Sequence, residues 1–159
     1  MKITILAVGK IKETFYRNAV AEFQKRLSRY TKLEIIETAD EKTPDEASET
    51  ENRKIREMEG ERLMKHIRAN AYVIALAIEG KMMDSLELSE KIRQQGVYGT
   101  SHLVFVIGGS LGLADMVLER ADFKLSFSKM TFPHQLMRVI LLEQIYRSYR
   151  IMNHEPYHK

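Results

Sequence analysis

Residues 102–112 read HLVFVIGGSLG, an apolar run that ends directly in a glycine-rich stretch. The run His102–Ile107 has the length of a strand and no polar residue after its first position, which is typical of a strand buried on both faces. Tyr72–Ile78 (YVIALAI) has the same character. Strands of this kind need helices on both sides, so the two segments favour an α/β protein with a mostly parallel sheet.

The segments around these runs alternate between strand-like and helix-like patterns. Glu13–Arg29, for example, has an apolar residue at every fourth position, as in a helix with one buried face. The other expected strands are Lys2–Val8, Leu33–Thr38 and Lys124–Phe127, and the other expected helices are Glu51–Arg68, Ser85–Gln95, Leu113–Ala121 and Phe132–Met152. No repeat or linker divides the chain, so the sequence predicts one α/β domain over residues 1–159.

The composition is that of a globular protein. The chain has 159 residues, 44% of them apolar and 30% charged, which suffices for one packed core. It has no cysteine, which excludes disulfides, thiolate metal sites and cysteine nucleophiles and is compatible with a cytoplasmic localisation. No segment approaches the ~20 apolar residues of a membrane span, and Lys10 and Lys12 end the N-terminal apolar run too early for a signal peptide. We therefore expect no membrane partner.

Charge is distributed unevenly along the chain, although the net charge is only +3. Residues 1–33 carry a net charge of +6 and residues 120–159 a net charge of +4, whereas residues 34–61 carry −7. Basic surfaces attract polyanions such as RNA, and an acidic stretch is repelled by them. Solvation of ordinary helix faces explains the same distribution equally well.

Three loops are candidates for ligand binding, because ligands of open α/β sheets bind beyond the carboxyl ends of the strands. They are Glu79–Lys81, Gly108–Gly112 and Ser128–His134, and each follows an expected strand. In a parallel sheet all three lie at the same edge. The sequence therefore predicts one pocket lined by the three loops.

The glycine-rich loop by itself is a weak motif. Glycines allow positive φ angles and a close approach of a ligand to the backbone. Gly108, Gly109 and Gly112 do not have the spacing of the G-x-G-x-x-G dinucleotide motif, and no Lys-Ser or Lys-Thr pair follows as in a P-loop. The loop therefore disfavours a phosphate-binding enzyme, and a tight strand-to-helix turn is an alternative explanation.

The loop before the last helix has an unusual composition. Pro133 suits the first position of a helix, where its missing N–H is not needed. Thr131 or Phe132 is then expected to cap the helix, and the backbone groups of residues 127–132 lie outside regular structure. Such groups suit the edge of an adenine, which needs a donor and an acceptor close together. An ordinary helix entry explains the loop as well.

Few side chains near the C-terminus are suited to chemistry. His134 and Arg138 are four residues apart and share one face of the last helix. His134 and His158 lack a third ligand close in sequence, so we expect no metal. No serine lies at a nucleophile elbow, and no carboxylate pair is evident. A pocket that binds chiefly through its backbone suits transfer of a group from an already activated donor.

Three segments together resemble a known family. Val104–Leu113 (VFVIGGSLGL), Leu125–Arg138 (LSFSKMTFPHQLMR) and Pro156–Lys159 (PYHK) are similar to segments of the small SPOUT-class methyltransferases that modify 23S ribosomal RNA. The resemblance covers the whole chain and is weakest at Asp40–Gly60. It implies an α/β knot, whose C-terminal segment threads through a loop, a topology that no propensity argument predicts. It also implies methylation of N3 of a pseudouridine with S-adenosylmethionine.

The resemblance further implies the donor site and the partners. The expected donor-binding residues are Leu76, Gly108, Phe127, Ser128, Lys129, Met130, Thr131 and Phe132. The expected partners are 23S ribosomal RNA or the ribosome, rather than DNA, and a second copy of the chain in a homodimer. Tyr157 and His158 of the tail are expected to complete the partner's site.

Four residues are the catalytic candidates. N3 of the base must lose a proton during the reaction. In-line alignment of two reactants can lower the activation barrier by ~7–11 kcal/mol, so positioning is expected to provide most of the acceleration. Arg138 is expected to orient the RNA or stabilise charge on the base. His134, Tyr157 or His158 is expected to help remove the proton. Simpler roles stay open, namely pairing of Arg138 with Glu143 or a phosphate, and a hydrogen bond from His134 at the helix start.

Two other function classes stay open at this point. A non-catalytic RNA-binding module on the same scaffold would bind RNA without transferring a methyl group. A nucleotide-dependent enzyme using Gly108–Gly112 would bind ATP better than S-adenosylmethionine, and its affinity would depend on the phosphates.

Overall fold

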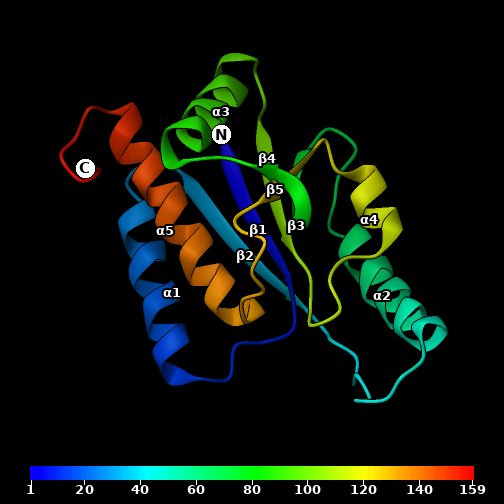
Figure 1. Ribbon diagram of the computed structural model, residues 1–159. Coiled ribbons are helices and arrows are strands. Elements are labelled where there is room, and N and C mark those ends of the chain that lie inside the picture. The colour runs from blue at the N-terminus through cyan, green and yellow to red at the C-terminus, as the bar shows by residue number, and fades with distance from the viewer.

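The computed structural model describes residues 1–159 and contains a five-stranded sheet in which all neighbouring strands are parallel (Figure 1). The strand order is β2-β1-β4-β3-β5. The strands are β1 (Lys2–Val8), β2 (Lys32–Thr38), β3 (Tyr72–Met82), β4 (His102–Ile107) and β5 (Phe123–Ser126). The predicted parallel α/β sheet is confirmed.

Five helices cover the sheet on both faces. They are α1 (Thr14–Leu27), α2 (Glu49–Met64), α3 (Ser85–Val97), α4 (Asp115–Arg120) and α5 (His134–Met152). Helices α1, α3 and α5 pack on one face, and α2 and α4 pack on the other (Figure 1). Apolar strands of a parallel sheet require cover of this kind.

Strand β4 shows why its apolar run is unbroken. Leu103, Phe105 and Ile107 belong to the core under α1, α3 and α5. Val104 and Val106, which point the other way, belong to the smaller core under α2 and α4. All five side chains are at most 4% exposed, so every one of these positions has to be apolar.

The end of β3 differs from the prediction. The sequence pattern predicts a strand that stops at Ile78 and a loop after it, but β3 continues past a bulge to Met82. A Cβ atom on Gly80 would lie 2.7 Å from the backbone carbonyl of Lys124, so only glycine lets the two chains come this close. The strand can therefore resume its pairing with β5 after the bulge.

The start of α5 also differs from the prediction. The helix begins at His134, and Pro133 is its N-cap residue rather than its first helical residue. No side chain caps the helix, so the expected caps Thr131 and Phe132 are wrong. The carbonyl of Pro133 accepts a hydrogen bond from the N–H of Met137 (3.1 Å). Proline can take this position because an N-cap residue needs its carbonyl and not its N–H.

Helix α2 begins two residues before the predicted start at Glu51, because Ser48 caps it. Oγ of Ser48 accepts a hydrogen bond from the backbone N–H of Glu51 (3.1 Å). The remaining elements agree with the predicted ones to within a few residues. None of the helices has both the length and the apolar character that crossing a membrane requires.

Candidate functional site at the carboxyl edge of the sheet

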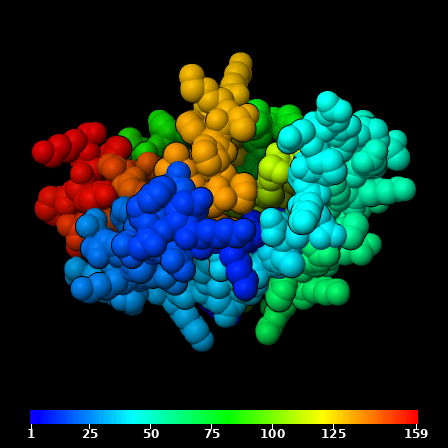
Figure 2. All heavy atoms as spheres, turned by 90° about the horizontal axis from the view of Figure 1, so that it is seen from below, coloured from blue at the N-terminus to red at the C-terminus, as the bar shows by residue number.

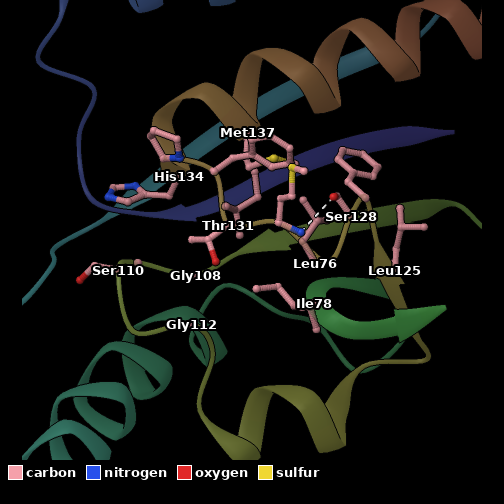
Figure 3. Close-up of a pocket in the computed structure, with 17 residues that line it drawn as sticks. Leu76, Ile78, Gly108, Ser110, Gly112, Leu125, Ser128, Thr131, His134 and Met137 are labelled. Atoms are coloured by element: carbon pink, nitrogen blue, oxygen red, sulfur yellow. Dashed lines mark hydrogen bonds between the residues drawn. The ribbon is translucent and has the colours of Figure 1, made fainter. Parts of the chain in front are cut away.

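A pocket of about 500 Å³ opens between the bulged middle of β3, the ends of β4 and β5, and the start of α5 (Figure 3). It is lined by Leu76, Ala77, Ile78, Ile107, Gly108, Gly109, Ser110, Gly112, Leu125, Phe127, Ser128, Met130, Thr131, Phe132, Pro133, His134 and Met137. Two of the three predicted loops, Gly108–Gly112 and Ser128–His134, contribute to this one pocket. The third prediction is wrong, because Glu79–Lys81 lies within β3 and outside the lining, and Leu76, Ala77 and Ile78 of that strand line the pocket instead. The volume suits a nucleoside-sized ligand.

The lining contains all but one of the predicted donor-binding residues. The exception is Lys129, which is exposed in the loop after β5. Most of the lining side chains are apolar, and no three His, Cys, Asp or Glu side chains of the chain gather as metal ligands do. A ligand of this pocket would therefore meet apolar side chains and backbone groups.

The glycine-rich loop folds back on itself. The N–H of Gly112 donates to the carbonyl of Gly109 (3.0 Å), and Gly112 has a φ angle of +82°. A Cβ atom on Gly108 would lie 2.7 Å from the backbone carbonyl carbon of Gly112, so the turn has no room for a side chain there. Helix α4 begins only at Asp115 and has six residues, so the loop does not run straight into a helix N-terminus that would hold a phosphate.

The loop after β5 offers free backbone donors. Its shape is held by two serines, since Oγ of Ser126 donates to the carbonyl of Ser128 (3.1 Å) and Oγ of Ser128 accepts from the N–H of Met130 (3.0 Å). No other N–H group between Phe127 and Phe132 donates a hydrogen bond within the chain. The side chain of Met130 is 72% exposed. The loop is thus a shaped segment with unpaired amides beside the pocket.

His134 is the one predicted catalytic residue that lines the pocket. Its ring is half-buried, and its Nδ1 atom is buried without a hydrogen-bond partner. Burial and the positive charge of Arg138 lower the pKa of His134 below its usual value, against the opposing effect of Asp40 and Glu13. The ring is therefore uncharged at neutral pH and has one nitrogen that can accept a proton.

Arg138 points away from the pocket and into the protein. Its side chain is 1% exposed, and its guanidinium pairs with the carboxylate of Glu37. It also donates to the backbone carbonyls of Val8 (3.1 Å) and Gly9 at the end of β1. The same Glu37 carboxylate accepts a hydrogen bond from the N–H of Ile11 (3.1 Å). Arg138 thus ties the first turns of α5 to the segment between β1 and α1.

The C-terminal tail lies along α5, away from the pocket of its own chain. The hydroxyl of Tyr157 donates to Glu143 (2.8 Å), and Glu143 also pairs with Arg147 (2.9 Å). The pairing of Glu143 with Arg138, considered from the sequence, is therefore wrong. Glu143 lies about nine residues after His134 in α5, which is roughly 14 Å along the helix. Within one chain, the tail and the pocket are apart.

The contacts of the tail determine which of its groups can move a proton. Nη1 of Arg147 lies 3.1 Å from Nδ1 of His158. Because a guanidinium can only donate, this nitrogen accepts, and the neutral ring carries its proton on Nε2. Burial and the hydrogen bond to Glu143 raise the pKa of Tyr157 above its usual value, so its hydroxyl stays protonated at neutral pH. Both tail residues are therefore hydrogen-bond donors in this arrangement.

A buried carboxylate, Glu59, lies next to the glycine-rich loop and was not among the predicted residues. It is 5% exposed and accepts a hydrogen bond from the N–H of Glu41 (3.0 Å). A Cβ atom on Gly109 would lie 3.4 Å from one of its oxygens. The signal that could have found it is its spacing, because Glu59 lies four residues after Ile55 and four before Leu63, the apolar positions of the same helix.

Replacing Glu59 with glutamine is expected to stabilise the protein at neutral pH by about 1 kcal/mol, because burial disfavours the charged carboxylate. Burial raises the pKa of Glu59 above its usual value, so the native state binds more protons than the unfolded state, and stability falls as the pH rises above that value. Glutamine keeps an oxygen for the N–H of Glu41. Urea unfolding at pH 5 and pH 8 tests this expectation.

The matched control for this experiment is Glu57→Gln on the same helix, where the side chain is exposed and the expected change is below about 0.5 kcal/mol. Equal curves for the Glu59 and Glu57 variants at both pH values would contradict the assigned cost of burying Glu59.

Fold and pocket together define a class of protein, an α/β protein that binds its ligand in loops at the carboxyl ends of parallel strands. A family model described as "Predicted SPOUT methyltransferase" matches residues 1–158. The chain therefore belongs to the SPOUT methyltransferase family, and the resemblance drawn from three sequence segments is confirmed. Membership of this family also implies the knotted C-terminal topology.

Curated relatives match over their full length. The chain is 63% identical to "Ribosomal RNA large subunit methyltransferase H" of Bifidobacterium adolescentis, over 100% of both chains. It is 60% identical to the protein of that name from Clostridium tetani and 58% identical to that from Clostridium kluyveri, again over 100% of both chains. The similarity therefore includes the segment Asp40–Gly60, where the resemblance was weakest.

Proposed function

We infer that the chain is a ribosomal RNA methyltransferase that transfers a methyl group from S-adenosylmethionine to N3 of a pseudouridine in 23S ribosomal RNA. The observation that carries this proposal is the pocket built by the middle of β3, the ends of β4 and β5 and the start of α5 in a chain of the SPOUT methyltransferase family. The names of the relatives support large-subunit ribosomal RNA as the substrate. A ribosomal substrate favours the cytoplasm as the place of the reaction.

The residues of the pocket fit an adenosyl ligand. The unpaired amides of the loop Phe127–Phe132 can donate to the adenine edge, and side chains such as Leu76 and Met137 can contact its faces. Gly108 brings the backbone of the glycine-rich loop to the pocket without a side chain between them. S-adenosylmethionine, when bound, supplies a methyl group on a sulfonium, and the neutral thioether is the leaving group.

The chain itself would position the base and accept its proton. Of the predicted catalytic residues, His134 alone lines the pocket, and it is neutral, so it is the proposed acceptor of the N3 proton. Arg138 has no free surface with which to touch the base. Its proposed role is to position the β1–α1 segment beside His134 through Glu37 and the carbonyl groups of β1.

A homodimer would bring the tail of one copy to the pocket of the other. This arrangement is proposed because the tail contacts Glu143 and Arg147, roughly 14 Å of helix away from His134 in the same chain. In the partner's pocket, Nε2–H of His158 could donate to a carbonyl oxygen that flanks N3 of the base, while Tyr157, whose O–H is bonded to Glu143, would hold the tail in position. The tail would thus help to hold the base while His134 accepts the proton.

Calorimetry and a transfer assay test the proposed function. S-adenosylmethionine is expected to bind the protein more tightly than ATP, because the glycine-rich loop lacks a phosphate cradle. Ribosomes or 23S RNA lacking the modification are then incubated with labelled donor, and the labelled nucleoside is identified by mass spectrometry. RNA binding without methyl transfer would favour a binding module, and phosphate-dependent binding of ATP would favour a nucleotide-dependent enzyme; either result overturns the proposal.

Mixing two inactive variants tests the shared site. Deletion of residues 156–159 is expected to lower transfer at least tenfold while leaving donor binding unchanged, because the tail lies outside its own pocket. Gly108→Ala is expected to impair donor binding. Each mixed dimer of the two variants contains one intact pocket facing one intact tail, so one of its two sites is active. About half of the dimers in an equal mixture are mixed, so mixing is expected to restore up to about one quarter of the wild-type activity. Two variants that stay inactive when mixed, although they form mixed dimers, would contradict a site shared between copies.

A further inference from the structure

Residues 9–17, here called the rim segment, comprise the connection between β1 and α1 (residues 9–13) and the first turn of α1, and they have no contact with a ligand in the function described so far. Gly9 lies next to the pocket residue His134, since a Cβ atom added to Gly9 would lie 3.7 Å from the imidazole ring. In Figure 2, which views this side of the molecule, the blue N-terminal segment lies beside the orange loop that precedes α5. The rim segment therefore begins next to the pocket.

This rim segment carries a net positive charge, because its three basic residues outnumber its one acidic residue, Glu13. Lys10, Lys12 and Arg17 are all exposed, and none of them forms an ion pair with the chain. Ile11, between the lysines, is 8% exposed and its N–H donates to Glu37 (3.1 Å), so both flanking side chains point to solvent from an anchored backbone. Anchored, unpaired lysines are suited to phosphate groups.

An exposed aromatic ring follows these lysines in the sequence. Phe15, at the start of α1, is 65% exposed, and its ring centroid lies 4.4 Å from that of Tyr16. An exposed Phe beside free basic groups is the combination with which proteins bind single-stranded RNA, through base stacking and phosphate contacts.

The other side of the rim is acidic. Asp40 lies 3.8 Å from the Cβ position of Gly9, and the segment that follows it carries the exposed side chains of Asp45, Glu46 and Glu49. Figure 2 shows this segment, in cyan, on the other side of the orange loop from the bulk of the blue segment. Phosphates are repelled there. An RNA strand that reaches the pocket is therefore expected to run over residues 9–17.

We propose that Lys10, Lys12 and Phe15 form the RNA-contacting rim of the pocket: the two lysines contact phosphates, and Phe15 stacks on an unpaired base next to the target nucleotide. This inference rests on the proposed function and names the surface that the substrate uses. It also gives the buried contacts of Arg138 a purpose, because they hold Gly9 and, through Glu37, Ile11 in place.

Variants of these residues test the rim in the full-length protein. Lys10→Ala/Lys12→Ala is expected to lower kcat/KM for the RNA substrate at least tenfold. Because two phosphate contacts are lost, the slope of log KM against the logarithm of the salt concentration is expected to fall by about 1 to 2. Phe15→Ala is expected to cost about 5- to 150-fold in kcat/KM, and Phe15→Tyr to retain most of the activity, because a ring stacks on a base. Affinity for S-adenosylmethionine is expected to stay unchanged in all three.

Matched controls are exposed residues away from the pocket. Lys25→Ala/Lys32→Ala removes two exposed lysines without ion pairs, and Tyr98→Ala removes a ring that is 74% exposed at the opposite edge of the sheet. These controls are expected to keep the wild-type kinetics. If the rim variants behave like them while the wild-type protein transfers methyl groups, the rim proposal is overturned and the proposed function stands.

Two further outcomes are distinguishable. If the wild-type protein neither binds S-adenosylmethionine nor transfers methyl groups, the proposed function itself fails. If Phe15→Ala changes the molecular mass in analytical ultracentrifugation, Phe15 covers a second copy of the chain rather than RNA, and its proposed stacking role is overturned.

Discussion

Replacing Gly108 with alanine is expected to weaken the binding of S-adenosylmethionine by about 10- to 100-fold while the rest of the chain stays folded. The added Cβ atom would lie 2.7 Å from the carbonyl carbon of Gly112 and 3.1 Å from the backbone N of Leu113. Both are backbone atoms, so no side chain can move aside, and the turn itself must open. Because Gly108 lines the pocket, this opening moves the backbone that is proposed to hold the donor.

Titration calorimetry measures this effect directly, with circular dichroism to show that the fold persists. The matched control is Gly96→Ala in α3, where a Cβ atom would meet nothing within 4 Å. Alanine in place of a helical glycine is expected to stabilise by about 0.5–1 kcal/mol and to leave donor binding unchanged. Tight donor binding by the Gly108 variant would show that the glycine-rich loop is not part of the donor site.

Replacing Arg138 with alanine is expected to lower the free energy of unfolding by about 3 kcal/mol. The change leaves the carbonyl of Val8 and that of Gly9 without their donor, and it leaves Glu37 without its counter-charge. The Glu37 side chain is 33% exposed and keeps some contact with water, which places the expected loss at the lower end for a broken buried ion pair. Denaturant unfolding measures it.

The control for this variant is Arg93→Ala, which removes an exposed arginine paired with Glu90 (2.6 Å) and is expected to cost less than about 1 kcal/mol. A purely catalytic Arg138 would behave differently: stability would be retained, and transfer would be lost at saturating RNA and donor. Retained stability together with lost transfer would therefore contradict the positioning role and favour direct contact with the base.

Strand β4 illustrates what sequence patterns predict well. His102–Ile107 is predicted and observed with identical bounds, because a strand between two cores must be apolar at every position and no other arrangement satisfies that pattern. The location of the pocket follows from the same pattern, since the loops after parallel strands share one edge. Gly108 could therefore be placed at the pocket before any coordinates were known, whereas Leu76 followed from the family resemblance, because the pattern pointed to Glu79–Lys81, which lies outside the lining.

Other features depend on contacts between distant parts of the chain. Arg138 pairs with Glu37, about a hundred residues away, and a periodicity that examines neighbouring residues cannot anticipate such a pair. The continuation of β3 depends on the close approach of Lys124 to Gly80. Glu59 is buried because α2 packs against the glycine-rich loop, although its local surroundings in the sequence are mostly polar.

The amino-acid sequence by itself determined the parallel α/β sheet, the edge that carries the pocket and the family, because each is encoded in local runs of apolar residues or in short motifs. Tertiary structure alone decided the side-chain roles around the pocket. It turned Arg138 inward and bonded Tyr157 to the middle of α5. The physical reason is that burial and pairing depend on the neighbours that folding brings together, and these are far apart along the chain.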